Sequence, residues 1–301
     1  MPSSLDNCFF SGNSADPNKG YGGGLEIMGT LAVTNCAFFD CSAARGGGLC
    51  VSKASTATIV NCTFVNNQGG ADGGGIGLYS ATSVTVTNCV IAFSSAGPAV
   101  GGTGAITVSH GNLFGNAGGD WVGPVAGQGG TAGNISVDPA FVDAAAGDFH
   151  LTALSPCRGA GDPAAAGLPL HDIEGDPRSV AGAVDMGADQ FYYHLYNMGT
   201  VLPGGSILLR VVGSPGAAVR LALGSGVSDP PMGTPHGDLF VGLPLLAQWN
   251  LPPLPPQGVL SVTAGVPSAW TAGDEFPFQA LVGTWGAPRT RLTNLMMLTV
   301  E

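Results

Sequence analysis

A short segment recurs four times in the first hundred residues, and its spacing limits the folds open to the chain. Each copy begins with Asn-Cys and ends on an aromatic or aliphatic residue; the copies are Asn7–Phe10, Asn35–Phe38, Asn61–Phe64 and Asn88–Ile91. Their cysteines are 28, 26 and 27 residues apart. Three consecutive glycines, followed by Leu or Ile, recur in phase with these segments and begin at Gly22, Gly46 and Gly73. This spacing is typical of proteins built from stacked repeats.

The alternation of apolar residues within one repeat predicts strands that are joined by a tight bend. Val84 and Val86 occupy even-numbered positions and would point to the same face of a strand. Cys89 and Ile91 occupy odd-numbered positions, so the alternation of inward residues changes phase at Asn88. Successive side chains of a strand point to opposite faces, and a change of phase therefore marks a bend between two strands. Asn is the non-glycine residue best suited to the left-handed conformation of such a bend. A third short strand is expected after each glycine triplet, so each repeat is predicted to form one three-stranded rung of a parallel β-helix.

Composition and charge exclude several classes of protein. Glycine makes up 50 of 301 residues, but 45% of the chain is hydrophobic and only 10% is charged, whereas disordered chains show the reverse balance. The formal net charge is −11, and the few basic residues are scattered. We therefore expect no nucleic-acid partner, since there is no basic patch to neutralise phosphates. No run of about 18 apolar residues occurs, so no membrane span is expected.

The Asn-Cys and triple-glycine rungs resemble the right-handed parallel β-helix repeats of pectin-lyase-like proteins. Residues 133–157, with Gly-Asn-Ile-Ser-Val-Asp-Pro-Ala-Phe-Val-Asp, Gly-Asp-Phe-His-Leu and Ser-Pro-Cys, are similar to segments that close such helices in large secreted or surface proteins of environmental bacteria. Residues 172–178 and 184–189 continue this likeness, although Arg158-Gly159 stands where an aliphatic residue and an aspartate are usual. The resemblance spans residues 5–191 and implies an extracellular or cell-surface location. The first residues lack a secretory signal, and we expect that signal and further rungs to lie upstream of Met1.

The repeats stop near residue 193, and the chain changes character. Short alternating runs separated by Gly and Pro follow, which predicts an antiparallel β-sandwich. This part resembles a small C-terminal β-domain of secreted proteins of planctomycete and myxobacterial type. The sequence thus predicts an all-β chain with three parts: a right-handed parallel β-helix, N-terminally incomplete, over residues 1–160; a closing segment and linker over 161–192; and a small β-sandwich over 193–301.

Candidate functional residues stand beside the glycine triplets, because pectin-lyase-like enzymes use a groove along that strand. Tyr21, Arg45 and Asp72 precede the three triplets, and Glu26 is the first outward residue after the first triplet. A polysaccharide lyase needs a base, often Arg or Lys, and carboxylates that hold Ca²⁺; a glycosidase needs two facing carboxylates. In an enzyme, Arg45, Asp72 and Glu26 would be the catalytic group, and Tyr21, Arg45 and Asp72 would contact the ligand. An exposed ion pair on neighbouring rungs is the favoured interpretation, because no known lyase or polygalacturonase site pattern is matched.

A second candidate site lies in an acidic run. Asp172, Glu174 and Asp176 alternate around Gly175, and oxygen ligands at this spacing can bind Ca²⁺, although the full twelve-residue loop pattern is missing. Arg178 offers a competing explanation, since a bidentate Arg–Asp pair would fasten the turn. The structural ion pair is favoured, and no other cofactor is predicted.

The seven cysteines and five histidines give no catalytic or zinc-binding pattern. Four cysteines share the same inward position, which predicts a buried ladder of thiols. Cys41 and Cys50 could form a disulfide in an oxidising compartment, but no C-x₂₋₄-C pair for a metal occurs. The histidines are isolated in sequence, and no nucleophile motif accompanies them, so no hydrolytic triad is expected.

Two classes of function remain. The favoured one is a non-catalytic extracellular or cell-surface protein that acts as a scaffold, as an adhesin-like module, or by contacting a polysaccharide or cell-envelope glycan. The alternative is a polysaccharide lyase or glycosidase that acts on an acidic polysaccharide in the groove beside Arg45 and Asp72. The short track of about four to five rungs and the few ionisable groups near the groove favour the first class.

Overall fold

The computed structural model shows an all-β protein, as the sequence predicts. It describes residues 3–178, 182–192, 195–198, 202–224, 227–234, 237–241, 245–266, 268–269, 271–272, 275–282, 291–292 and 296–299. Within these residues the only helical elements are two single 3₁₀ turns, η1 (Gly123–Val125) and η2 (Ala144–Ala146). No helix in the described ranges is long and apolar enough to cross a membrane. The chain divides into two compact units, Met1–Leu151 with Ser155–Phe191, and Thr152–Leu154 with Tyr192–Glu301.

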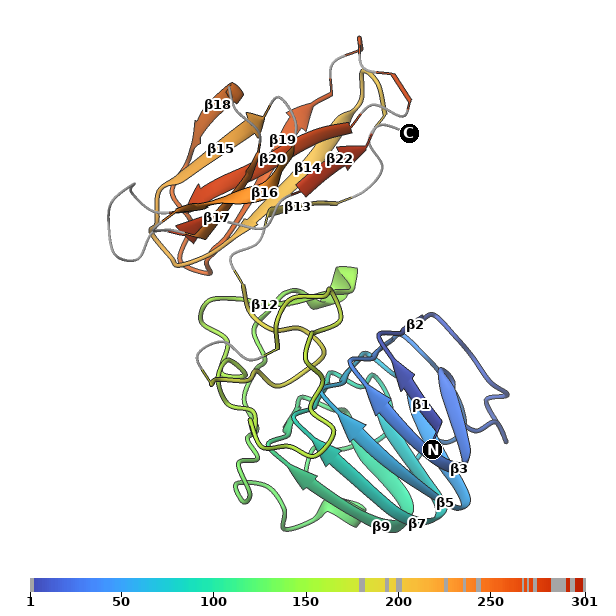
Figure 1. The fold of residues 1–301 in the computed structure, drawn as a ribbon. Helices are drawn as coiled ribbons and strands as arrows, with labels where there is room; N and C mark the ends of the chain where they lie inside the picture. Colours follow the sequence, from blue (N-terminus) through green and yellow to red (C-terminus); the bar gives the residue numbers. More distant parts are fainter. Residues whose placement is uncertain are drawn as a thin grey trace. The chain divides into compact units, whose positions relative to one another are not determined.

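The first unit contains two parallel sheets whose strands alternate along the chain (Figure 1). The long-strand sheet consists, in spatial order, of β1 (Ser3–Asp6), β3 (Leu25–Thr34), β5 (Leu49–Val60), β7 (Ile76–Thr87) and β9 (Val100–Ser109). The short-strand sheet consists of β2 (Phe9–Ser11), β4 (Ala37–Phe39), β6 (Thr63–Val65), β8 (Val90–Ala92) and β10 (Asn112–Phe114). Equivalent positions pair across rungs: Leu25 pairs with Leu49, Leu49 with Ile76, and Ile76 with Val100. The unit is therefore a parallel β-helix.

Asparagine makes the bend between the long and the short strand, as predicted. The φ angles of Asn7, Asn35, Asn61 and Asn88 are 54°, 48°, 50° and 55°. In the fifth rung His110 takes the same conformation, with φ 47°. These angles lie in the left-handed region, where asparagine is several-fold enriched among non-glycine residues.

One detail of the predicted rung is corrected by the structure. The sequence suggests separate strands after the glycine triplet and before the Asn bend, but in each of the three middle rungs these form one strand of 10 to 12 residues. A kink within the strand accounts for the change of direction: Gly29, Lys53, Ala54 and Ser80 have positive φ there. Pairing to the neighbouring rungs resumes beyond the kink, with a register shift between Met28 and Thr30.

Identical side chains stack on one another inside the β-helix. The rings of Phe10, Phe38 and Phe64 lie parallel, with 4.7 Å between successive centroids. Next to this stack runs the predicted ladder of thiols, in which Cys36, Cys62 and Cys89 are buried and Cys8 is half-buried. All seven cysteines are free, so Cys41 and Cys50 form no disulfide.

The phased glycines are required by this stack. Gly46 has φ 61°, a conformation that glycine adopts without steric cost. A Cβ atom on Gly48 would lie 2.9 Å from the ring of Phe64 and 2.8 Å from the carbonyl oxygen of Gly75. The triplets therefore allow the turn and the aromatic ladder to approach each other closely.

The chain beyond β10 folds back along the β-helix. We call residues 155–178 and 182–191 the return segment. The side-chain amide of Asn88 accepts a hydrogen bond from the backbone N–H of Asp162, with 2.7 Å between the heavy atoms. The amide of Asn61 donates to the carbonyl oxygen of Asp185 at 3.0 Å. The amide of Asn35 donates to the carbonyl oxygen of His171 at 2.7 Å. The bend residues thus also anchor the return segment, which runs beside the rungs.

The outer face of the short-strand sheet is covered by this part of the chain. The antiparallel hairpin of β11 (Phe141–Asp143) and β12 (Asp148–Leu151) places Phe149 against Phe9 and Phe39. Thr63 in β6 accepts a hydrogen bond from the backbone N–H of Ala188 at 2.9 Å. All residues of β6 and β8 are consequently buried, on both faces of the sheet.

The second unit is antiparallel, as expected for the C-terminal part. One sheet contains β13 (Leu195–Met198), β14 (Ser206–Val212) and β19 (Val259–Gly265). Another contains β18 (Leu245–Leu251), β15 (Val219–Gly224) and β20 (Glu275–Val282), with β21 (Arg291–Leu292) and β22 (Met296–Thr299) paired to β20. The hairpin of β16 (Val227–Thr234) and β17 (Gly237–Val241) completes the described strands. Ile207, Leu209 and Val211 of β14 share a core with residues of β15 and β20. That shared core agrees with a β-sandwich, which remains a prediction.

Candidate functional site

Three of the residues predicted beside the glycine triplets lie together on neighbouring rungs. Tyr21 pairs with Arg45 through an isolated parallel bridge between their backbones. The Nε atom of Arg45 lies 2.7 Å from Oδ2 of Asp72 on the next rung. The two side chains are 31% and 37% exposed, so this ion pair sits at the surface and remains accessible to a ligand.

A fourth residue, Tyr79, completes the group and is absent from the sequence-based set. The rings of Tyr21 and Tyr79 are 5.0 Å apart between centroids. Cζ of Arg45 lies 5.2 Å from each centroid, within the range of a cation–π interaction. We call Tyr21, Arg45, Asp72 and Tyr79 the tyrosine–arginine cluster. Tyr79 is the second outward residue of its strand after the glycine triplet, and this parity is the signal that could have identified it.

The predicted acid Glu26 belongs to the neighbouring strand β3 and is held by a serine. Its Oε1 accepts a hydrogen bond from Oγ of Ser52 at 2.7 Å. Glu26 is paired in register with Cys50, which is buried. Burial, reinforced by the nearby charge of Glu26, raises the pKa of Cys50 to about 12. Cys50 is therefore a neutral thiol at physiological pH and not a thiolate nucleophile.

The cluster is built for contact more than for proton transfer. An arginine side chain stays protonated in proteins, and Arg45 is further held by the Asp72 carboxylate and by two aromatic rings. The carboxylate of Asp72 in turn accepts from Arg45. Neither group is arranged as an uncommitted general base.

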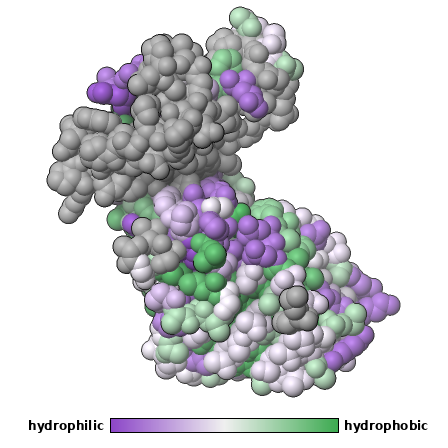
Figure 2. All heavy atoms as spheres, viewed as in Figure 1, coloured by the Kyte–Doolittle hydropathy of each residue, from purple (hydrophilic) through white to green (hydrophobic). Residues whose placement is uncertain are grey.

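An open cleft of about 650 Å³ begins at Asp72 and continues over the later rungs. It is lined by residues Gly69–Asp72, Gly97, Pro98, Val100–Thr103, Gly118 and Val122–Pro124. The glycines are there because chain segments approach closely: a Cβ on Gly101 would lie 2.4 Å from the carbonyl oxygen of Ala71. Asp72 and Thr103 are the polar side chains of this lining. In Figure 2 the surface over the strands of the first unit is mostly pale, with hydrophobic and hydrophilic residues interspersed.

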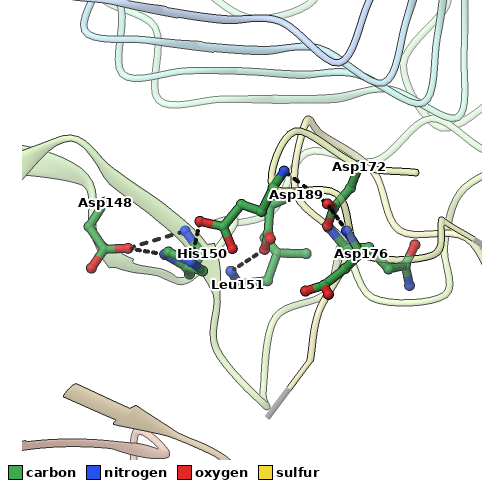
Figure 3. A network of polar contacts seen from close by, with 8 residues as sticks. Asp148, His150, Leu151, Asp172, Asp176 and Asp189 are labelled. Carbon is green, nitrogen blue, oxygen red and sulfur yellow. Dashed lines mark hydrogen bonds and ion pairs between the residues drawn. The ribbon is translucent and has the colours of Figure 1, made fainter. Parts of the chain in front are cut away.

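The acidic run of the second candidate site is placed in the return segment, and its three carboxylates have different roles (Figure 3). Asp172 is buried, and its Oδ1 accepts hydrogen bonds from the backbone N–H groups of Glu174 at 3.0 Å and Asp176 at 2.9 Å. Its Oδ2 accepts from the N–H of Gln190 at 2.9 Å. Asp172 thus fastens the turn. Burial, together with the charges of Asp172 and Glu174, raises the pKa of Asp176 to about 6.

Glu174 meets a histidine that the sequence analysis left isolated. Oε1 of Glu174 lies 3.0 Å from Nε2 of His150, and Oδ1 of Asp148 lies 2.6 Å from Nδ1 of the same ring. Burial alone would lower the pKa of His150, but its hydrogen bonds to Asp148 and Glu174 outweigh burial and raise it. Burial raises the pKa of the neighbouring Asp189. Among the described residues, His150, Glu174 and Asp189 are the one group of three side chains whose ligand atoms lie within 4.8 Å of one another. The predicted set Asp172, Glu174 and Asp176 does not converge in this way.

The predicted bidentate pair between Arg178 and an aspartate is not formed. Arg178 is fully buried and donates to the carbonyl oxygens of Gly187 at 3.1 Å and Ala188 at 2.6 Å, and to Oδ1 of Asn35. Within the described residues no carboxylate lies within ion-pair distance of this guanidinium. The guanidinium is instead held by two backbone carbonyl oxygens of the return segment and by the side chain of Asn35, at the bend between β3 and β4. Burial lowers the pKa of Arg178, against the opposing effect of Asp172 and two other buried aspartates.

Comparison with known proteins agrees with the repeat architecture. Residues 3–124 match the family model described as the right handed beta helix region. No curated protein matches the chain. The first unit is therefore built from the repeats of a right-handed parallel β-helix, and the family match ends before β11, the return segment and the second unit.

Proposed function

We propose that this chain is a non-catalytic extracellular or cell-surface protein whose β-helix contacts a polysaccharide through the tyrosine–arginine cluster. The observation that carries the proposal is the position of Arg45, whose Cζ lies 5.2 Å from the centroids of both Tyr21 and Tyr79. The extracellular location rests on the resemblance of the repeats and of residues 133–189 to secreted or surface proteins.

The chemistry of the cluster suits a sugar ring. An aromatic face carries partial negative charge and attracts the C–H groups that cover one face of a pyranose. Arg45 uses Nε to bind Asp72. A guanidinium has five donors, so the two terminal nitrogens can donate to sugar hydroxyls or carboxylates.

The arrangement of the rungs suits a polymer. Neighbouring strands of a sheet are about 4.8 Å apart, so Tyr21, Arg45 and Asp72 follow the helix axis at roughly this interval. The cleft that begins at Asp72 extends this line over the rungs of β7 and β9. A chain of sugar units lying along the axis would touch the aromatic cluster first and then the glycine-lined cleft.

Affinity electrophoresis or a glycan array with pectate, alginate and neutral glucans tests the proposal. We expect retention by at least one polymer, and at least about tenfold weaker binding for Tyr21→Ala and Tyr79→Ala, since each removes an aromatic contact worth about 1.4 kcal/mol. Trp249→Ala, an exposed aromatic of the second unit, is the matched control and should bind as the native chain does. Absence of retention by every polymer would leave only a scaffold role.

The lyase alternative is separated by a turnover assay. With pectate or alginate and Ca²⁺, we expect no unsaturated product at 235 nm. Product formation that is abolished by Arg45→Ala would replace the proposal with the lyase alternative.

A further inference from the structure

Three chain segments bring a histidine and two carboxylates together in the first unit, and none of these residues belongs to the tyrosine–arginine cluster (Figure 3). His150 belongs to β12, Glu174 to the turn that Asp172 fastens, and Asp189 to the end of the return segment. One ligand atom from each of the three lies within 4.8 Å of the other two, and Nε2 of His150 is 3.0 Å from Oε1 of Glu174.

Asp189, a member of this group, has a buried oxygen without a hydrogen-bond partner among the described residues. Asp189 is only 6% exposed, and within the part of the chain that the structure describes its Oδ1 has no hydrogen-bond partner. Its Oδ2 accepts from the backbone N–H of Leu151 at 3.1 Å, which fixes the direction of the carboxylate. A buried polar atom left unsatisfied is costly, and native proteins keep such atoms where a ligand, ion or water satisfies them.

The histidine is oriented as metal-binding histidines are. Nδ1 of His150 lies 2.6 Å from Oδ1 of Asp148, a buried carboxylate. A carboxylate that accepts a hydrogen bond from one ring N–H sets the plane of the ring, so that a metal ion can replace the proton on the other nitrogen. In this arrangement Nε2 faces Glu174 and Asp189.

We propose that His150 Nε2, Glu174 Oε1 and Asp189 Oδ1 bind one divalent transition-metal ion, for which Zn²⁺ is the best match. One imidazole nitrogen and two carboxylate oxygens are ligands that zinc accepts, with water in a fourth position. Metal–ligand bonds of about 2.1 Å would set tetrahedral ligand atoms roughly 3.4 Å apart. Here Nε2 of His150 and Oε1 of Glu174 are 3.0 Å apart, and the ligand atoms of all three residues lie within 4.8 Å of one another. Ca²⁺ requires six to eight oxygen ligands. The ion would fasten β12, the acidic turn and the end of the return segment to one another.

Isothermal titration of the metal-stripped, untagged full chain with ZnCl₂ tests this site. We expect uptake of one equivalent, and at least about 100-fold weaker binding in Asp189→Asn, Glu174→Gln and His150→Gln, because each removes a direct ligand. Asp40→Asn, an exposed carboxylate at a left-handed position that asparagine also favours, is the matched control and should bind as the native chain does. Circular dichroism of each variant verifies that it is folded.

Two further measurements make the result specific. CoCl₂ should give the visible absorption of a four-coordinate site without a thiolate charge-transfer band, which excludes binding to the free cysteines. Asp176→Asn should leave Zn²⁺ binding within about threefold of native, because Asp176 is outside the ligand set. Failure of the native chain to bind Zn²⁺, binding unaffected by Asp189→Asn, or a preference for Ca²⁺ that depends on Asp176 would each overturn the proposal.

Discussion

The two sheets of the β-helix are built by the same repeats, yet the outer faces of their middle strands differ in exposure. In the short-strand sheet every residue of β6 and β8 is buried, because β12 and the return segment pack on it. In the long-strand sheet the outer residues beyond the kink, such as Thr85 and Thr107, are exposed. The outer face of β6 and β8 has become interior, while the part of the long strands beyond the kink keeps outward side chains in contact with solvent.

The chemistry of the outward residues explains this difference. On the covered side the bend asparagines offer amide groups that pair with the backbone of the return segment, and Thr63 accepts from the N–H of Ala188. On the uncovered side the outward positions hold β-branched threonines, which favour strands and keep their hydroxyls in water. A covered face therefore needs specific hydrogen-bond partners, whereas an uncovered one needs only residues that suit a strand.

Among substitutions on the covered side, Arg178→Met is expected to lower the free energy of unfolding most. The change removes the donors to the carbonyl oxygens of Gly187 and Ala188 and to Oδ1 of Asn35, all of which would stay buried. We expect a loss of about 3–5 kcal/mol in the free energy of unfolding of the first unit. Hydrogen–deuterium exchange of peptides from residues 155–178 and 182–191 measures it.

The control for Arg178→Met is Arg220→Met in β15 of the second unit. Arg220 is exposed and bonds Asn250, so its removal should cost about 0–1 kcal/mol. Unchanged protection of the return segment in Arg178→Met would show that this segment is held by something other than the arginine.

A second comparison uses two asparagines that make the same bend. Asn61→Ala loses both the residue suited to a left-handed φ of 50° and the hydrogen bonds to the carbonyl oxygens of Asp185 and Gly187. We expect a cost of about 2–4 kcal/mol in the free energy of unfolding. Asn7, with φ 54°, has an exposed side chain, and Asn7→Ala should cost about 1 kcal/mol.

Asn61→Gly separates the two contributions, because glycine accepts the left-handed conformation but donates no side-chain hydrogen bond. Denaturant unfolding should then show a remaining cost of about 1–3 kcal/mol. Equal effects for Asn7→Ala and Asn61→Ala would mean that the return segment adds nothing to the bend.

The smallest change in the free energy of unfolding is expected when one threonine of each sheet is replaced by valine. Thr63→Val in β6 deprives the N–H of Ala188 of its acceptor and should cost about 1–3 kcal/mol. Thr85→Val in β7 changes an exposed residue of a strand and should stay within about 0.5 kcal/mol of the native free energy of unfolding. Thermal unfolding of both variants is the measurement. A cost for Thr85→Val as large as that for Thr63→Val would contradict the distinction between the two faces.

The periodic part of the fold could be predicted because each rung repeats the same sequence features, the Asn-Cys segment and the glycine triplet. Phase counting placed Asn35 and Asn61 at left-handed bends and set Arg45 beside Asp72. It missed Tyr79 because the count ended at the first outward residue of the strand. The joining of two expected strands into one was also missed, since a kink with positive φ leaves the pairing between rungs largely intact.

The aperiodic part could not be predicted, because its contacts join residues far apart in the sequence. Asn35 and His171 are 136 residues apart, and nothing in either neighbourhood repeats the other. His150 has a local signal, since Asp148 and His150 alternate on one strand and can face the same way. Its partners Glu174 and Asp189 lie on irregular segments. There the sequence has no alternation from which the direction of a side chain could be predicted.

The separation of Asn35 and His171 along the sequence also affects how the chain folds while it is being synthesised. At about 5–20 residues per second, translation needs roughly 7–27 s to add the 136 residues between them. During that time the emerging rungs can stack, but the outer faces of Ala37, Phe39 and Val65 have no cover. We therefore expect the early rungs to expose these apolar side chains until the return segment has been synthesised and packs on them.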